Sequence, residues 1–389
     1  MMISYVKRGL KRMEYNSYFA SEDAAVVFAL QETDGIGWKT IHKLASLQMP
    51  LIEALRMPTP KLLAAGIPAK QARVIQSIRI EETIEVRLPV YMENHVHIIT
   101  PFDNDYPTLL KEISTPPWVL YVLGDKNRLK YPSFAVVGTR HPTYYGKQAA
   151  EKLSRELSNT GLTIISGLAR GIDKIAHTGA LQGRGSTIAV LGTGLDQIYP
   201  REHRALFQSI AEKGCIVTES PWGTPFHPGL FPLRNRIIAG LSLGTLVVEA
   251  AERSGSLITA DYALEYSRDV FAVPGPIFSK QSQGTLKMIQ QGAKLVTCCS
   301  DILEEYEHRV SLHSMEASDE GALQDEAELT EDERFIIRLF EGTESFTFDQ
   351  LLEKSKFTFG HLHSVLLHLT LKTQIIQLPG SSYMRNMDS

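Results

Sequence analysis

The sequence predicts an α/β protein whose main domain is a parallel β-sheet with helices on both faces. Two observations lead to this prediction. From residue 134 onward, short runs rich in Val and Ile alternate with segments of helical periodicity; the runs are FAVVG, LTIISG, STIAVLG, CIVTES, TLVVEA and DVFAVPG. Each run is apolar throughout, which is typical of a strand buried on both faces. Strands that alternate with helices form parallel sheets, because each connection must cross over one face.

The composition agrees with a globular protein of more than one domain. The chain has 389 residues, of which 43% are hydrophobic and 22% charged. No apolar run approaches the roughly 20 residues that cross a bilayer, and the first residues do not resemble a secretory signal. Three cysteines, Cys215, Cys298 and Cys299, form neither a disulfide framework nor a metal-ligand spacing. We expect a cytoplasmic protein without a membrane span, metal or cofactor.

Changes of pattern divide the chain into four segments. Residues 1–88 are predicted to form short helices resembling SAM-like or helix-hairpin-helix modules. Residues 89–310 hold the sheet, preceded by a Pro-rich lead-in that we expect to be extended and irregular. Residues 311–330 are predicted to be an acidic, flexible linker. Residues 331–389 are predicted to form a small winged-helix-like domain of three short helices and a β-like tail.

Charge is unevenly distributed along the chain. Between Val310 and Glu333 there are nine acidic residues and no Lys or Arg. Removing these nine negative charges from the net charge of −4 leaves +5 on the rest of the chain. A basic site is therefore compatible with an acidic protein.

Small residues and arginines follow the predicted strands. Right-handed crossovers bring the loops after parallel strands to one edge of the sheet, where such sheets bind ligands. A small residue lets a ligand approach the backbone, and a guanidinium group suits a phosphate. Asn235 is expected to cap the helix that it opens. The residues predicted to bind an anion at this edge are Gly138, Thr139, Arg140, Ser166, Gly167, Arg170, Arg201, Arg234, Asn235 and Arg236.

The pattern favours a polymer of phosphates over a nucleotide. The P-loop motif is absent, and Gln197 occupies the third glycine position of a dinucleotide motif. Arginines on several loops can follow a nucleic-acid backbone, and exposed aromatic rings can stack on its bases. Most of the nearby aromatic residues, Phe207 in particular, are expected to be core, and one or two to be stacking platforms. They are Tyr144, Tyr145, Tyr199, Phe207, Trp222, Phe226 and Phe231.

The sequence offers no convincing catalytic set. Asp173 and His177 fall four residues apart on one helical face, where we expect a structural hydrogen bond. Neither a Ser-His-Asp constellation nor a metal-binding motif can be assembled. We therefore expect no enzymatic activity and assign no catalytic residue.

The motifs VVGTR, ISGLARGID, IAVLGTGLDQIYPRE, FPLRNRIIAGLS and SGSLITA, in this order, resemble the DNA processing protein A family, DprA, also called Smf. The resemblance implies an extended Rossmann-like domain that binds single-stranded DNA without catalysis and forms a homodimer. It also implies that the protein protects incoming DNA and loads the recombinase RecA onto it during natural transformation. The family's DNA-contacting positions correspond to Arg140, the Ser166–Gly167 pair, Arg201 and the box 234–236.

Three positions depart from the family pattern, and none removes a positive charge. Thr139 replaces a serine and keeps the hydroxyl group. His203 and Thr285 each replace an asparagine, which puts any polar contact from those positions in doubt.

Two other functions fit parts of the sequence. LSLGTLVVEA resembles the motif of lysine-decarboxylase-like enzymes, which cleave nucleoside monophosphates at the N-glycosidic bond, and keeps Gly244, Thr245 and Glu249. However, Leu241 and Ser242 stand where paired glycines should admit the phosphate. A pure adaptor that binds RecA or a regulator through its C-terminal domain is the other alternative, and it leaves the arginine loops unexplained.

Overall fold

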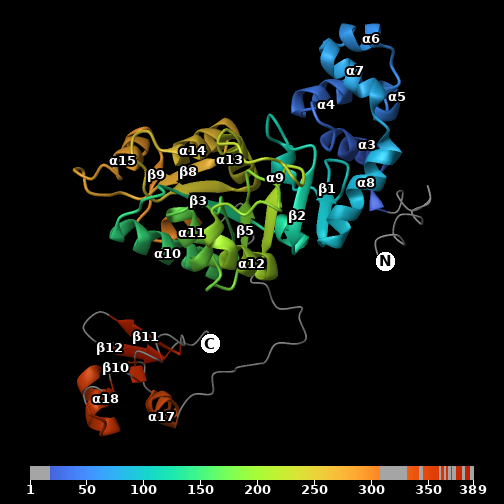
Figure 1. The fold of residues 1–389 in the computed structure, drawn as a ribbon. Helices are drawn as coiled ribbons and strands as arrows, with labels where there is room; N and C mark the ends of the chain where they lie inside the picture. Colours follow the sequence, from blue (N-terminus) through green and yellow to red (C-terminus); the bar gives the residue numbers. More distant parts are fainter. Residues whose placement is uncertain are drawn as a thin grey trace. The chain divides into compact units, whose positions relative to one another are not determined.

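The computed structural model describes residues 18–306 and, with gaps, residues 331–385. The chain divides into two compact units, Met1–Glu316 and Ala317–Ser389 (Figure 1). The predicted linker at 311–330 lies outside the described residues. Within the described ranges, no helix has the length and apolar character needed to span a bilayer.

The first unit begins with a set of short helices. They are α3 (Glu22–Gln31), α4 (Trp38–Ala45), α5 (Leu51–Leu55), α6 (Thr59–Ala64), α7 (Ala69–Ser77) and α8 (Ile80–Glu93). Ser21 caps α3 by accepting a hydrogen bond from Ala24 N at 3.1 Å. Proline residues precede α5, α6 and α7, where the missing N–H costs nothing. The helices agree with the predicted pattern, although α8 continues past residue 88, so the expected segment boundary falls inside a helix.

A nine-stranded sheet forms the body of the same unit. Its strands are β1 (Val96–Ile99), β2 (Leu120–Gly124), β3 (Ser133–Val137), β4 (Thr163–Ser166), β5 (Thr187–Val190), β6 (Cys215–Thr218), β7 (Gly244–Val247), β8 (Asp269–Ala272) and β9 (Lys294–Leu295). The spatial order is β1-β2-β6-β5-β4-β3-β7-β8-β9. Each of the strands β3 to β9 is parallel to its neighbours within that group. The predicted parallel sheet is confirmed.

The lead-in is more regular than the sequence predicts. It contributes β1 and β2, which pair with each other and with β6 in antiparallel fashion. Val96 pairs with Leu123, and Tyr121 with Thr218. The expectation of an extended, irregular lead-in is wrong here, because its prolines lie between the two strands and leave both short apolar runs free to pair.

Helices cover both faces of the sheet (Figure 1). The helices that follow β2 are α10 (Tyr144–Asn159), α11 (Ile172–Ala180), α12 (Arg204–Lys213), α13 (Leu230–Leu241), α14 (Gly255–Glu265), α15 (Gln283–Gln290) and α16 (Ser300–Leu303). Along β3, Phe134 and Val136 join the core beneath α10 and α11. Ala135 and Val137 join the opposite core beneath α13 and α14. The carboxyl ends of the parallel strands consequently open between these two layers.

The second unit has a core of its own. It contains α17 (Glu331–Leu339), α18 (Phe348–Ser355) and a three-stranded antiparallel sheet of β10 (Phe346–Thr347), β12 (Ser382–Arg385) and β11 (Ile375–Leu378). Ile336, Leu351 and Leu366 are buried together. Thr347 and Gln350 form a capping box at the start of α18. Strand β10 lies between α17 and α18, and β11 and β12 follow them. The winged-helix-like arrangement of three helices and a β-like tail stays a prediction.

Candidate functional site

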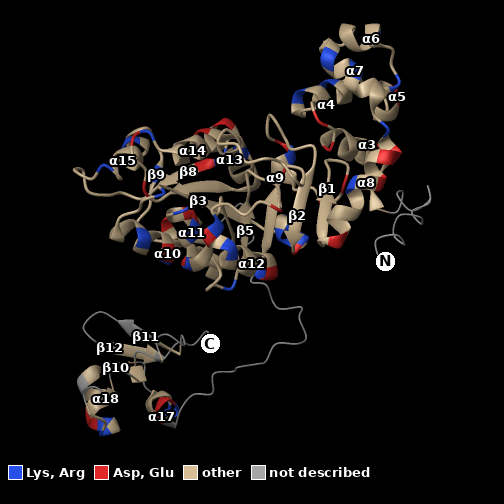
Figure 2. Ribbon diagram, viewed as in Figure 1, with Lys and Arg blue, Asp and Glu red and all other residues tan. Residues whose placement is uncertain are grey.

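Overall charge does not reveal a site in the first unit. Basic and acidic residues alternate along its helices (Figure 2). A basic site therefore depends on local geometry at the carboxyl ends of the strands.

The turn after β3 carries the first three predicted residues. A Cβ atom at Gly138 would come within 2.6 Å of Ile172 Cγ1, so the turn packs directly on α11. Thr139 is buried, and its hydroxyl accepts a hydrogen bond from His141 N at 3.2 Å. Arg140 is exposed, and no hydrogen bond or ion pair joins it to the described residues. The turn is thus fixed from within, while the Arg140 guanidinium remains available to a ligand.

Arg234 has entirely different surroundings, because it is buried beneath this edge. Its Nη1 donates to Gly167 O at 2.7 Å and to Val190 O, at the ends of β4 and β5. Burial lowers the pKa of Arg234 to about 10, and the nearby carboxylate of Asp173 acts in the opposite direction. The guanidinium therefore stays charged at neutral pH and ties two strand ends together. Its Nη2 has no hydrogen bond to the described residues.

Gly167 is the residue that makes room for this guanidinium group. A Cβ atom at Gly167 would lie 2.3 Å from Arg234 Nη1 and Nη2. The small residue predicted to admit a ligand instead admits an arginine of the same chain. Ser166 is buried as well, and its hydroxyl donates to Val136 O at 2.6 Å.

The predicted role of Asn235 as a helix cap is wrong. Helix α13 begins at Leu230, so Asn235 lies within the helix. Pro232 falls in the first turn, where its missing N–H is tolerated, and the helix can start before the arginine box. Asn235 Oδ1 accepts from Arg234 Nε at 3.3 Å, and its amide nitrogen donates to Gly255 O at 3.3 Å. Asn235 therefore links α13 to the start of α14.

Arg236, the third member of the box, points into the protein. It is buried, and its Nη2 donates to Glu219 Oε2. Burial raises the pKa of Glu219, and Arg236 opposes that shift. This ion pair joins α13 to the end of β6, and Arg236 has no place among the residues lining the cavity described below.

Arg170 and Arg201 lie on neighbouring loops and are both exposed. Arg170 Nε forms an ion pair with Glu202 Oε1 at 2.5 Å, and this hydrogen bond lowers the pKa of Glu202 to about 2. An exposed pair of this kind contributes little to stability, so Arg170 can exchange its carboxylate partner for another anion.

Two buried histidines hold the loop after β4. Leu168 has a positive φ of 54°, which is uncommon for a residue with a side chain. His177 Nε2 accepts from Leu168 N at 3.3 Å, and His203 Nδ1 donates to Leu168 O at 3.0 Å. His203, which replaces the family asparagine, thus retains a polar contact with the backbone.

The predicted hydrogen bond between Asp173 and His177 is wrong, because each side chain has other partners. Asp173 Oδ2 accepts from Gly167 N at 3.2 Å, and His177 Nδ1 lies 2.6 Å from Thr187 Oγ1. Thr187 Oγ1 also donates to Ile164 O, so Nδ1 carries the proton of a neutral imidazole. Burial lowers the pKa of His177 to about 3, in agreement with this assignment.

A cavity of about 500 Å³ opens where the loops after β3 and β7 face α13. Among the predicted residues it is lined by Gly138, Thr139, Arg140, Arg234 and Asn235. The remaining five, Ser166, Gly167, Arg170, Arg201 and Arg236, do not line it. The structure therefore brings half of the predicted set into one cavity.

The other wall of the cavity comes from a segment that sequence reasoning left out. Arg253, Ser254, Gly255 and Ser256 follow β7 and line the cavity at the start of α14. Ser254 caps this helix. The positive end of the helix dipole and the Arg253 guanidinium both favour an anion. The SGSLITA motif could have revealed them, because it too places small residues between a strand and a helix.

Aromatic side chains gather beside the same cavity. Tyr199, Phe226 and Phe231 lie with ring centroids 4.8–5.5 Å apart, and Phe231 lines the cavity. Tyr199 and Phe226 are 39% and 48% exposed. Phe207 is buried, which confirms that it belongs to the core. The expectation that most of the nearby aromatic residues are core is wrong, because Tyr144, Tyr145, Tyr199 and Phe226 are exposed.

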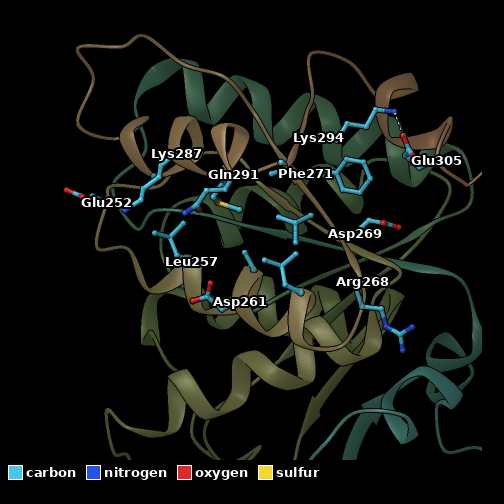
Figure 3. Close-up of a pocket in the computed structure, with 17 residues that line it drawn as sticks. Glu252, Leu257, Asp261, Arg268, Asp269, Phe271, Lys287, Gln291, Lys294 and Glu305 are labelled. Carbon is cyan, nitrogen blue, oxygen red and sulfur yellow. Dashed lines mark hydrogen bonds and ion pairs between the residues drawn. The ribbon is translucent and has the colours of Figure 1, made fainter.

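A second cavity of about 520 Å³ lies between α14 and α15 (Figure 3). Arg268, Lys287 and Lys294 line it, and Lys294 forms an ion pair with Glu305 at 2.7 Å. Four acidic residues line the same space, namely Glu252, Asp261 of α14, Asp269 of β8 and Glu305. Asp173 is the one acidic residue among those lining the first cavity. A polyanion would meet more carboxylates in the second cavity, so the first cavity is the better candidate.

Fold and site together define a Rossmann-like α/β protein with a basic cavity at the carboxyl edge of its sheet. Residues 97–307 match the family described as DNA recombination-mediator protein A, and the chain belongs to that family. Protein Smf of a Synechocystis species is 45% identical over 308 residues, which are 78% of this chain and 76% of that protein.

Solved structures agree with this assignment. The X-ray structure of DNA processing protein A from Streptococcus pneumoniae superimposes with a TM-score of 0.64 at 36% identity, covering 73% of this chain and 98% of that one. DNA processing protein A from Helicobacter pylori, whose single-stranded DNA binding mode has been studied structurally, gives a TM-score of 0.50 at 33% identity, covering 55% of this chain and 96% of the other. The family expectation and the expected fold are confirmed.

Proposed function

We propose that this protein binds single-stranded DNA, without catalysis and without regard to sequence, at the carboxyl edge of its sheet. One observation carries the proposal: Arg140, Arg234 and Arg253 share one cavity with the start of α14. Arg140 has no hydrogen-bond or ion-pair partner among the described residues, so its guanidinium is available to bind a phosphate. The Helicobacter pylori relative, which binds single-stranded DNA, supports the same ligand.

The neighbouring aromatic cluster suits an unpaired strand. Tyr199, Phe226 and Phe231 are partly exposed rings beside the cavity. Stacking contributes about 1–3 kcal/mol per base and tolerates any base. We therefore infer that phosphates bind at the arginines and bases stack on these rings, and that Arg170 and Arg201 contact the strand beyond the cavity.

The surroundings of the acidic residues support a role without catalysis. Glu249, the residue that the N-glycosidase alternative requires, is buried and accepts hydrogen bonds from Thr143 N at 2.9 Å and Thr143 Oγ1 at 2.5 Å. A Cβ atom at Gly146 would meet the same carboxylate at 2.2 Å. The Glu249 carboxylate thus holds Thr143 at the start of α10, and Glu249 is not among the residues that line the cavity. Incubation with AMP tests this alternative, and release of adenine would support it.

Family membership supports a proposal for the cellular role. We infer that the protein acts in the cytoplasm as a homodimer that protects incoming DNA and loads RecA onto it during natural transformation. This role is tested by an assay that measures RecA filament formation on DNA covered by single-strand-binding protein. Binding to bare oligo-dT tests the adaptor alternative, because a pure adaptor would not bind it.

The binding site is tested by fluorescence anisotropy with labelled oligo-dT at several salt concentrations. We expect Arg140→Ala to weaken binding and to flatten the slope of log affinity against log salt by about 0.7 for each phosphate that the variant no longer binds. Its melting temperature should not change, because Arg140 is exposed. An unchanged slope would place the phosphates elsewhere.

Arg234→Ala serves as the contrasting variant. It leaves Gly167 O and Val190 O without a donor in a buried place, which costs at least about 2 kcal/mol of unfolding free energy. We expect its melting temperature to fall along with its affinity, which separates structural damage from the removal of a phosphate-binding group.

A further inference from the structure

The connection between β6 and α13 bounds the proposed DNA site but makes few bonds of its own. It spans residues 219–229, carries Phe226 and leads into the helix of Arg234. Within it, Thr224 N and Thr224 Oγ1 bond to Pro221 O, and Gly229 N bonds to His227 Nδ1. Other parts of the chain must therefore hold its shape.

The loop after β5 supplies two of those contacts, because Ser220 Oγ donates to Gly192 O at 3.1 Å and Gly223 N donates to Asp196 Oδ1 at 3.0 Å. The helices at the start of the chain supply three more. Tyr91 of α8 accepts a hydrogen bond on its hydroxyl from Trp222 N at 2.8 Å. Arg87 Nη2, one turn earlier, donates to Trp222 O at 2.7 Å. Gln31 at the end of α3 donates to Glu219 O at 3.0 Å. Both backbone groups of Trp222 are thus bound by the helical segment.

Glu32 organises this contact from behind. Its side chain has no exposed surface and accepts hydrogen bonds from Arg87 Nε and from the hydroxyl groups of Tyr91 and Tyr121. The Tyr91 hydroxyl gives its hydrogen to Glu32, so its oxygen is free to accept from Trp222 N. Burial raises the pKa of Tyr91, which keeps the hydroxyl protonated.

We infer that Tyr91, held by Glu32, is a positioning residue for the DNA site, and that through it the helical segment fixes the connection that carries Phe226. The inference rests on the proposed function. Glu219 strengthens the argument, because its backbone binds Gln31 while its carboxylate binds Arg236 of α13. The helical segment therefore contacts both the connection and, through Glu219, the helix that follows.

Two matched variants test the inference in the full-length protein. Tyr91→Phe and Tyr121→Phe each remove one buried hydroxyl that donates to Glu32. The two rings are stacked, with centroids 4.7 Å apart. Only the Tyr91 hydroxyl also accepts from Trp222 N. Both variants therefore lose the hydroxyl bond to Glu32, while only Tyr91→Phe also leaves Trp222 N without its acceptor and should release the connection.

We expect Tyr91→Phe to raise the Kd for oligo-dT about three- to tenfold, the range for one missing hydrogen bond, and Tyr121→Phe to change it less than about twofold. Amide hydrogen exchange at Trp222 should accelerate only in Tyr91→Phe. If Tyr91→Phe fails to fold, Gln31→Ala removes the contact to Glu219 O without disturbing Glu32, and it should likewise raise the Kd and speed exchange in residues 219–222.

The outcomes distinguish this inference from the proposed function. Failure of the wild-type protein to bind oligo-dT would overturn both. Wild-type binding, with an unchanged Kd in Tyr91→Phe and Gln31→Ala, would overturn the positioning role alone. An equal decrease of affinity in Tyr91→Phe and Tyr121→Phe would also overturn it, because the effect would then follow from the hydroxyl bond to Glu32 that both variants lose.

Discussion

Two arginines at the edge of the sheet carry the same charge in very different surroundings. Arg140 is exposed with no partner among the described residues, whereas Arg234 uses its Nη1 to bind two backbone carbonyl groups. A buried guanidinium rigidifies the strand ends and still contributes positive potential to the cavity. At the scale of single residues, therefore, binding and scaffolding are divided between side chains of one type.

The histidine beneath the loop after β4 makes stability depend on pH. Because the pKa of His177 falls to about 3 in the folded protein, the unfolded chain takes up a proton first as the pH drops below about 6.5. The contribution of the neutral His177 ring to the free energy of unfolding is therefore complete above pH 6.5. Acidification below that pH decreases it by about 1.4 kcal/mol per pH unit.

Urea denaturation between pH 7.5 and 5 measures this effect, with His177→Gln as the control. The wild-type midpoint should fall more steeply on acidification than that of the variant. Burial raises the pKa of Asp173 and Glu219, which acts in the opposite direction in both proteins and leaves the difference to His177. Parallel curves would show that His177 is not buried as a neutral ring.

At the scale of elements, the sheet edge depends on how closely β4 approaches α13. Gly167, directly after β4, packs against the Arg234 guanidinium of α13 and leaves no room for a side chain. We expect Gly167→Ala to displace Arg234 and to weaken oligo-dT binding more than about tenfold, with a lower melting temperature, because the two carbonyl groups lose their donor.

A glycine elsewhere provides the matched control for that substitution. Gly37 has an ordinary φ of −123°, and a Cβ atom at this position would meet no other atom within 4 Å. Gly37→Ala should leave the affinity unchanged in the same anisotropy measurement. It should lower the melting temperature less than Gly167→Ala, because Gly37 is the N-cap of α4, where alanine is only somewhat less favourable than glycine. Wild-type affinity in Gly167→Ala would contradict the account of this packing.

At the scale of the whole molecule, all residues assigned to the DNA site lie within Met1–Glu316. The second unit has a separate core around Ile336 and Leu351. We expect a chain that ends at Glu316 to bind oligo-dT within about twofold of the full-length Kd, as measured by anisotropy. A larger decrease in affinity would mean that the second unit contributes to binding.

The four-segment division of the chain stays a prediction in its details. Contacts group the helical segment with the sheet, and the Glu32 cluster explains why: α3 and α8 share buried hydrogen bonds with β2 and with the connection after β6. A segment that looks separate by composition can therefore belong to the same compact unit.

The sequence by itself determined the succession of strands along the chain, the parallel sheet and the loops that carry the site. Uninterrupted Val and Ile runs leave no exposed face, and such strands must be covered by helices on both sides. The same reasoning missed β1 and β2, whose short runs stand among prolines, and it passed over Arg253 to Ser256 although their motif was visible.

Only the tertiary structure decided which arginines face a ligand. The sequence does not distinguish Arg140, Arg234 and Arg236, because it gives the charge of each side chain but not its distance to a carbonyl group or carboxylate. Helix α13 carries the arginine box in its interior, where Arg234 faces Gly167 and Arg236 faces Glu219. The direction of a side chain depends on the packing of elements far apart in the chain, which no local pattern records.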